Sequence, residues 1–365
     1  MELQFDPALK ELLLRVSGSP LGRGLSSAAA DRAINVVARL VDPNRPVPNM
    51  TVVSRFGSVV TARVPLGRLV DIRTDPNVAS LKASGTYVAD LADSVPAIGA
   101  DEISLKRVVP EGITGKGTVV GVIDWGFDFA HADFRDGQGN SRVRYLWDQR
   151  GGPHPTSPLP YRYGREFDHR DINKALHARD PYRVLGYDPA DMGVGAVGTH
   201  GTHVAAIAAG GGRADRSSPG VAPGADLIFV HLCGDDTAPE DTLGDSVRLL
   251  EAVDYVVNRA AGRPLVINLS VGRTGDSRDG TSPVERALDH VSESAPGRVV
   301  CISTGNNFRS RLHASGRVDQ DRKTVLRWRV PAHRPRPAEL EIWYGHADEF
   351  IFELEPPGES GKVSV

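Results

Sequence analysis

The chain has 365 residues, of which 40% are hydrophobic and 24% charged, and its formal net charge is −3. The length allows one large domain and a smaller one, and the weak charge gives no reason to expect nucleic acid or an anionic membrane as a partner. Charged residues at Glu2, Asp6, Lys10, Glu11 and Arg15 interrupt the N-terminal segment, so we expect no secretory signal, no membrane-spanning run and a cytoplasmic location.

Two N-terminal regions come first along the chain. Residues 1–30 form a short lead in which Leu9, Leu12, Leu13 and Val16 are spaced for one face of a helix. Residues 31–90 show a compact α+β pattern, which predicts a small independent unit. Its expected elements are a helix over 33–40, strands over 51–56 and 59–64, a short helix over 66–73 and a strand over 78–83.

Residues 94–320 show an α/β pattern. Continuous apolar runs predict strands buried on both faces of a parallel sheet, over 118–124, 226–232, 265–270 and 298–304. Helices are predicted over residues 245–260 and after Ser282, where Pro283 takes the first helical position. The aromatic-rich segment 137–198 is predicted to be an insertion with little regular structure.

The two cysteines, Cys233 and Cys301, each lie in an apolar run. We expect reduced core residues rather than a disulfide or metal ligands.

The pattern changes again towards the C-terminus. Apolar and polar residues alternate over residues 325–330, 340–344 and 350–354, which predicts antiparallel strands. We therefore expect residues 321–365 to be a β-rich insertion or the start of a further domain.

Three polar residues stand where an α/β active site would be built. Asp124 ends a buried strand, and the carboxyl edge of a parallel sheet is where such sites lie, although a turn aspartate is the alternative. His200 opens a helix of small residues and is a candidate general base. Asn306 follows Gly305 at a strand end, where its amide could donate to an oxyanion or simply belong to a turn.

Two other site types are weighed and set aside. His200 and His203 could be read as a metal pair, but no further ligand has suitable spacing, so we predict no metal site of this kind. Residues 193–198 fit the pattern GxGxxG, but no strand precedes them, which argues against a dinucleotide site.

Taken together, the motifs resemble those of the subtilisin-like serine proteases (subtilases, peptidase family S8). Five ordered segments over residues 94–306 carry the resemblance: Gly121-Val122-Ile123-Asp124, His200-Gly201-Thr202-His203-Val204-Ala205, Gly220-Val221-Ala222-Pro223, Val266-Ile267-Asn268-Leu269-Ser270-Val271-Gly272 and Ser303-Thr304-Gly305-Asn306. Ala206 departs from the family pattern, in which glycine is usual at this position. The resemblance implies a subtilisin-like parallel sheet flanked by helices.

The resemblance also implies catalytic roles for three residues. Asp124 would orient the imidazole of His200, which would relay the proton of a nucleophilic serine, and Asn306 would donate to the oxyanion.

It implies a polypeptide substrate as well. Ser270, Val271 and Gly272 would bind the substrate as an added strand, and Gly244 would contribute a second wall.

Two further expectations come from the resemblance. Residues 31–90 are similar to a subtilase propeptide, with cleavage expected near residues 87–91. Asp133 takes a position that binds calcium in some members, but calcium needs six to eight oxygens and one carboxylate is too little. We therefore expect no cofactor, and calcium is kept only as a secondary expectation.

No serine in the chain fits the nucleophile. The serines after Asn306 are Ser310, Ser315, Ser360 and Ser364, and none is followed by a predicted helix, as the family's nucleophile is. Ser282 stands in a similar motif, Gly280-Thr281-Ser282-Pro283, but it precedes Asn306 and is predicted to be a helix N-cap completed by Glu285.

The predicted function is therefore a subtilisin-type endopeptidase whose serine lies in a missing C-terminal segment, with the 365-residue chain inactive alone. The alternative is a pseudoprotease that acts as a peptide-binding or inhibitory module.

Overall fold

The structure, a computed structural model, describes residues 9, 30–84, 88–89, 113–189, 200–214, 219–233, 245–272, 275, 278–305, 312–320, 322–330, 340–345, 347–355 and 363–364. It forms two compact units, residues 1–274 with 280–312, and residues 275–279 with 313–365. None of the helices in the described ranges is long and apolar enough to cross a membrane.

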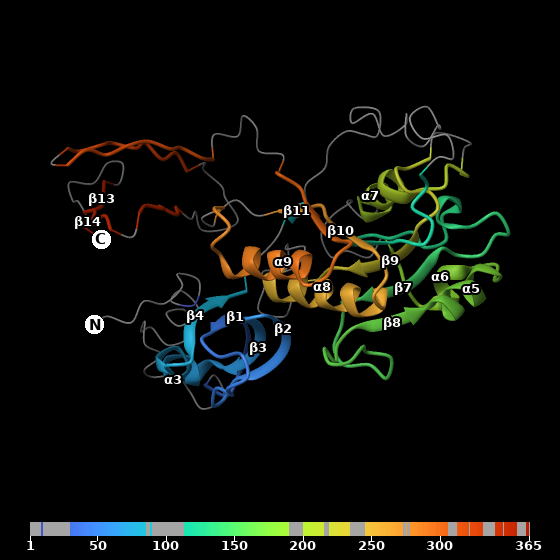
Figure 1. Cartoon of the computed structure of the whole chain (residues 1–365), viewed down its shortest axis with the longest axis horizontal. Helices are drawn as coiled ribbons and strands as arrows, with labels where there is room; N and C mark the ends of the chain where they lie inside the picture. The colour runs from blue at the N-terminus through green and yellow to red at the C-terminus, as the bar shows by residue number, and fades with distance from the viewer. Residues whose placement is uncertain are drawn as a thin grey trace. The chain divides into compact units, whose positions relative to one another are not determined.

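The first unit begins with a four-stranded antiparallel sheet in the order β2-β3-β1-β4 (Figure 1). Its elements are β1 (Ala33–Leu40), β2 (Thr51–Phe56), β3 (Val59–Pro65), a 3₁₀ turn (Leu66–Arg68), α3 (Leu69–Thr74) and β4 (Val78–Ala83). The strands predicted over residues 51–83 and the short helix are confirmed.

The helix predicted over residues 33–40 is wrong, because this segment is strand β1. Val36 packs on one face of the sheet with Leu69 of α3, whereas Val37 packs on the other face with residues of the main domain. Both faces of β1 are therefore apolar. Its sequence lacks the alternation of apolar and polar residues that marks a half-exposed strand, so it was predicted to be a helix. The β-branched valines favour the extended backbone.

The main domain contains a six-stranded sheet in the order β12-β10-β6-β9-β7-β8, parallel except for the edge strand β8. Its strands are β6 (Val119–Asp124), β7 (Val143–Asp148), β8 (Arg165–Asp168), β9 (Asp226–His231), β10 (Leu265–Leu269) and β12 (Arg298–Ile302). The four predicted parallel strands and the α/β class are confirmed.

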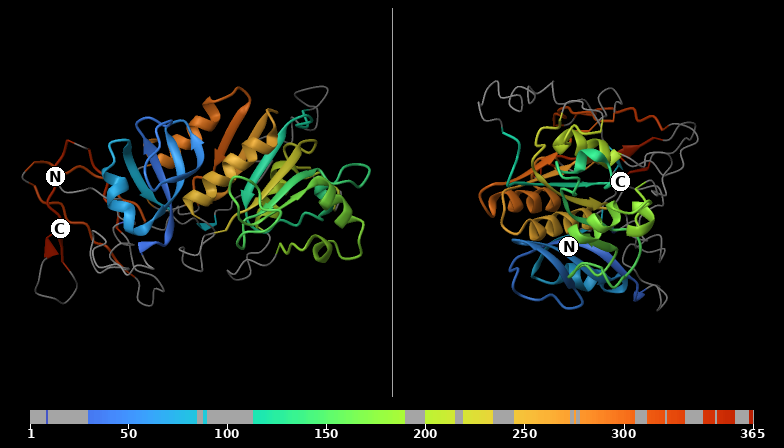
Figure 2. Two further views of the ribbon diagram at one scale, coloured as in Figure 1. Left: turned by 90° about the horizontal axis from the view of Figure 1, so that it is seen from below. Right: turned by 90° about the vertical axis from the view of Figure 1, so that its right-hand side faces the viewer.

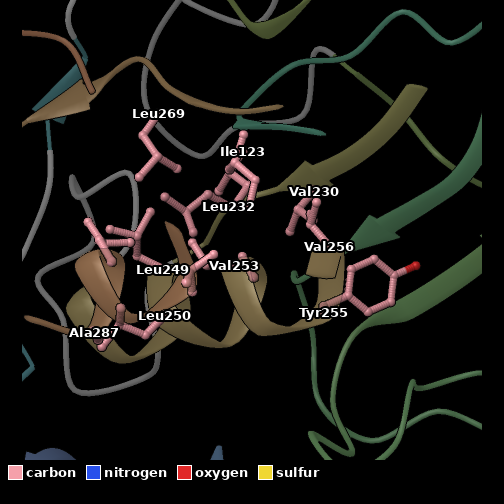
Figure 3. Packing of buried hydrophobic residues seen from close by; sticks show 14 of the residues in the cluster. Ile123, Val230, Leu232, Leu249, Leu250, Val253, Tyr255, Val256, Leu269 and Ala287 are labelled. Carbon is pink, nitrogen blue, oxygen red and sulfur yellow. The ribbon is translucent and has the colours of Figure 1, made fainter. Parts of the chain in front are cut away.

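Helices cover this sheet on both faces. On one face lie α8 (Ser246–Ala260) and α9 (Pro283–Glu293), which also contact the four-stranded sheet (Figures 1 and 2). Figure 3 shows the contact of α8 with the strands, where Val253 and Val256 face Ile123 and Val230, whereas Leu250 lies beside Ala287 of α9. On the other face, helix α7 (His200–Ala209) packs against β6 in an apolar cluster that includes Val122, Val204 and Ala205.

The segment 137–198 is not the irregular insertion that was predicted. It supplies β7 and β8 to the main sheet and two helices, α5 (His169–Leu176) and α6 (Pro181–Leu185). Its strands are short and lie between polar residues, so they gave little periodic signal. The buried residues Val143, Leu146 and Trp147 nevertheless place β7 beside β9 in the core.

The core position predicted for both cysteines is wrong for Cys301. Both thiols are free, but Cys301 is exposed and Cys233 is half-buried. Cys301 lies on β12, the edge strand of the sheet, where the apolar side chains of Val299 and Ile302 are exposed too.

In the second unit, the strands predicted over residues 325–330 and 340–344 are not present. Among its described residues, only β13 (Glu353–Leu354) and β14 (Val363–Ser364) pair, in antiparallel fashion. The alternating apolar side chains exist but are not buried, since Val325 is 73% exposed and Trp343 59%. The alternating pattern therefore predicted strands that do not form here, where these apolar side chains are not covered by another layer.

Ser282→Ala is expected to lower the free energy of unfolding by about 1 kcal/mol. Ser282 caps α9 as predicted: its hydroxyl accepts from the Glu285 amide at 3.3 Å, and the Glu285 carboxylate accepts from the Ser282 amide at 3.1 Å. Urea denaturation measures the loss, and Ser282→Asn, which retains a cap, is the control. Equal stability of the two variants would contradict a capping role.

Candidate active site

The structure brings Asp124 and His200 into direct contact. Asp124 is the last residue of β6 and His200 the first residue of α7. His200 Nδ1 lies 2.7 Å from Asp124 Oδ1, and both side chains are fully buried. Because a carboxylate only accepts, Nδ1 carries the proton and Nε2 of the neutral ring carries the lone pair. This arrangement can act as a general base.

Trp125 fixes the plane of the His200 ring. The two rings are stacked, with centroids 4.0 Å apart and planes 10° from parallel. The Trp125 amide donates to Asp124 Oδ1 at 2.7 Å, and the Trp125 carbonyl accepts from the Gly201 amide at 2.6 Å. Sequence reasoning did not assign a role to Trp125. The available signal was an aromatic residue directly after the aspartate at the end of the strand.

The segment predicted to bind substrate contains a short strand. Ser270 follows β10, and Val271–Gly272 form the short strand β11, which pairs antiparallel with Val88–Ala89 (β5). The backbone of β11 therefore already holds an extended segment, supplied here by the chain itself.

Residues 115–325, more than half of the chain, match the family model described as the Subtilase family. The chain belongs to the subtilase family. With this assignment the predicted subtilisin-like fold class is confirmed.

Several known proteases are similar to this subtilase. It is 28% identical over 290 residues to the PII-type proteinase of Lacticaseibacillus paracasei, which covers 75% of this chain and 14% of that protein. It is 27% identical over 202 residues to a thermophilic serine proteinase of Bacillus sp. (strain AK1), covering 53% of this chain and 46% of that one. The structure of the CspB protease of Clostridium perfringens is 26% identical, with a TM-score of 0.45, and the match covers 56% of this chain and 39% of that one. The subtilase thus spans less than half of each of these proteins.

Some predicted site residues of the subtilase lie outside the described residues. These are Asn306, Gly244 and, within the cleavage range 87–91, residues 87, 90 and 91. Their roles stay predictions.

Two metal arrangements were considered from the sequence, a pair of His200 with His203 and a calcium site at Asp133. His203 is exposed on α7, whereas His200 is buried against Asp124. Asp133 Oδ1 accepts from the backbone amides of Arg213 and Ala214, so this carboxylate organises a loop. Within the described ranges, no group of three or more His, Cys, Asp or Glu side chains could hold a metal ion.

Burial raises the pKa of the Asp124 carboxyl to about 6, against the opposing hydrogen bonds from His200 and from the Trp125 amide. Its second oxygen, Oδ2, is buried and has no hydrogen-bond partner within the described part of the subtilase. The ionised form, which accepts the Nδ1 proton of His200, therefore predominates only above about pH 6.

The stability of the subtilase is expected to fall as the pH rises from about 4 to about 6. The folded state binds the Asp124 proton more tightly than the unfolded chain, whose carboxyl pKa is 3.8. This contribution is complete below about pH 4 and is lost through about pH 6, with a magnitude of up to about 3 kcal/mol. Urea denaturation across this range measures it, with Asp124→Asn as control. Wild-type and variant profiles of the same slope would show that the carboxyl titrates at lower pH.

Proposed function

We propose that this subtilase chain is the front part of a serine endopeptidase that acts through an acyl-enzyme. The observation that carries the proposal is the buried 2.7 Å hydrogen bond between His200 and Asp124. Desolvating a carboxylate and an imidazole is costly, and a module that only binds peptides has no use for the pair.

In the proposed reaction, His200 transfers the proton and Asp124 stabilises its charged form. His200 takes the proton of the serine hydroxyl as the oxygen attacks the peptide carbonyl, and then donates that proton to the leaving amine. Asp124 stabilises the imidazolium formed between these steps. Asn306 would donate to the oxyanion, an interaction worth about 2.7–4 kcal/mol. Water then attacks the acyl-enzyme while His200 takes its proton and returns one to the serine oxygen, which releases the acid product. These steps require a polypeptide substrate and a serine.

We propose that the serine comes from polypeptide outside these 365 residues. Exposed apolar side chains on the edge strand β12 and on its neighbour β10 support this proposal, since Val299 and Ile302 of β12 are 48% and 51% exposed and Val266 of β10 is 37% exposed. Strands of parallel sheets are normally covered on both faces. A further segment that packs here would cover the apolar surface and could bring a nucleophile to the sheet.

We propose that residues 31–90 act as a propeptide. The antiparallel pairing of β5 with β11 supports this role, because a substrate would add to β11 in the same way. Ser270, Val271 and Gly272 are proposed to bind the peptide as an added strand, and Gly244 is proposed to form a second wall.

The test is to sequence the transcript beyond the codon for Val365. An open frame that encodes Gly-Thr-Ser, a small residue and proline is expected. Its full product should hydrolyse peptides, with activity abolished by His200→Ala. A stop codon with no such motif downstream would overturn the protease proposal for this polypeptide. It would favour the pseudoprotease alternative, in which β11 binds a peptide without turnover.

A further inference from the structure

Beside Asp124 in the main sheet begins a second buried pair, His231 and Tyr187, that the proposed reaction does not use. His231 ends β9 and stands opposite Asp124 in the register of the sheet. Its Nδ1 lies 2.8 Å from the hydroxyl of Tyr187, and the two residues are 1% and 2% exposed. Tyr187 belongs to the segment 137–198, far from both strands in the sequence.

The direction of this hydrogen bond follows from a second contact. The Tyr187 hydroxyl accepts from the backbone amide of Phe127 at 3.2 Å. Its single proton is therefore donated to His231 Nδ1, which must hold a lone pair. Burial and the nearby positive charge of Arg150 hold the pKa of His231 well below its usual range, so His231 is neutral and can accept.

Phe127 belongs to the segment that positions His200. Trp125 in this segment stacks on the imidazole, and the carbonyls of Trp125 and Gly126 accept from the Gly201 and Thr202 amides at 2.6 and 3.0 Å. The Phe127 ring is fixed as well, stacked on Phe229 with centroids 4.4 Å apart. A shift of Phe127 would therefore move the stacking partner and the helix start on which the orientation of His200 depends.

From these contacts we infer that Tyr187, oriented by His231, is a positioning residue for His200. The segment 137–198 thus supplies a phenol that holds residues 125–127 in place behind the active site. This inference rests on the catalytic role proposed for Asp124 and His200. Its test follows the hydrogen bond between His200 and Asp124 by spectroscopy, so the result does not depend on whether the chain hydrolyses peptides.

The test compares Tyr187→Phe with the wild-type 365-residue chain by NMR. The proton on His200 Nδ1 is followed directly, after assignment by its loss in Asp124→Asn. In Tyr187→Phe we expect this resonance to broaden or shift, and the Gly201 amide to exchange with solvent about tenfold faster, as for the loss of one hydrogen bond.

Tyr163→Phe is the matched control. It removes another buried hydroxyl, which donates to Glu251 at 2.8 Å on the α8 side of the sheet. We expect it to leave both His200 readouts unchanged. His231→Asn retains an acceptor near the Nδ1 position and should behave like wild type, whereas His231→Leu should behave like Tyr187→Phe.

Unchanged His200 and Gly201 signals in Tyr187→Phe would overturn the inference and leave Tyr187 with a purely structural role. Equal effects of Tyr163→Phe would overturn it too. If Tyr187→Phe fails to fold, the comparison of His231→Asn with His231→Leu decides: identical His200 signals in these two variants contradict the positioning role.

Discussion

Replacing Asp124 with Asn is expected to lower kcat of the complete protease about 10⁴-fold, with a much smaller effect on KM. The carboxylate accepts the Nδ1 proton of His200 at 2.7 Å, which leaves Nε2 with the lone pair that the reaction needs. An amide at this position can donate to Nδ1 instead, and the ring would then carry its proton on Nε2. The imidazole would keep its place but would no longer be a base towards the serine.

Steady-state hydrolysis of a peptide substrate by the full open reading frame measures this effect. Asp128→Asn is the matched control, because Asp128 lies on the same segment and accepts from the Tyr182 hydroxyl at 2.6 Å rather than from His200. We expect its kcat to stay within about tenfold of wild type. Comparable losses in both variants would indicate a general disturbance of residues 124–128 and would contradict a specific role for Asp124.

The contact between Asp124 and His200 was expected from the family resemblance, whereas local rules only place each residue at the end of an element. Asp124 ends a continuous apolar run, which marks a central parallel strand, and His200 opens a run of small helix-forming residues. Each signal is short-range, and the family motifs supply the rest. The N-cap at Ser282 was also predictable from local sequence, because Ser282 and its partner Glu285 are only three residues apart.

The missed features depend on tertiary partners. β1 was mistaken for a helix because each of its faces meets a different layer, α3 on one side and the main domain on the other. The segment 137–198 was underestimated because β7 is stabilised by pairing with β9, more than 75 residues further along the chain. Tyr187 is the same kind of case, since its two partners, Phe127 and His231, lie 60 and 44 residues away.

The second large effect, a loss of stability, is expected at the contact between α8 and the four-stranded sheet β2-β3-β1-β4, the N-terminal sheet. Glu251→Ala should lower the free energy of unfolding by about 3–5 kcal/mol, the usual cost of breaking a buried ion pair from one side. The Glu251 side chain is fully buried, and its two oxygens accept from the Arg63 guanidinium at 2.8 and 3.1 Å. The Tyr163 hydroxyl donates to it at 2.8 Å. Removal of the carboxylate leaves both donors without their acceptor.

Urea denaturation of the 365-residue chain measures this loss, and Glu293→Ala is the matched control because Glu293 is exposed on the neighbouring helix α9. We expect the control to stay within about 0.5 kcal/mol of wild type.

The triple variant Arg63→Met, Tyr163→Phe and Glu251→Leu should recover most of the loss, since it leaves neither a buried charge nor the Tyr163 hydroxyl without a partner. If Glu251→Ala costs no more than Glu293→Ala, the ion pair contributes nothing to holding the N-terminal sheet on α8. The apolar contacts of Val37, Phe56 and Val59, together with the hydrogen bond from Ser54 to Asp254, would then hold it.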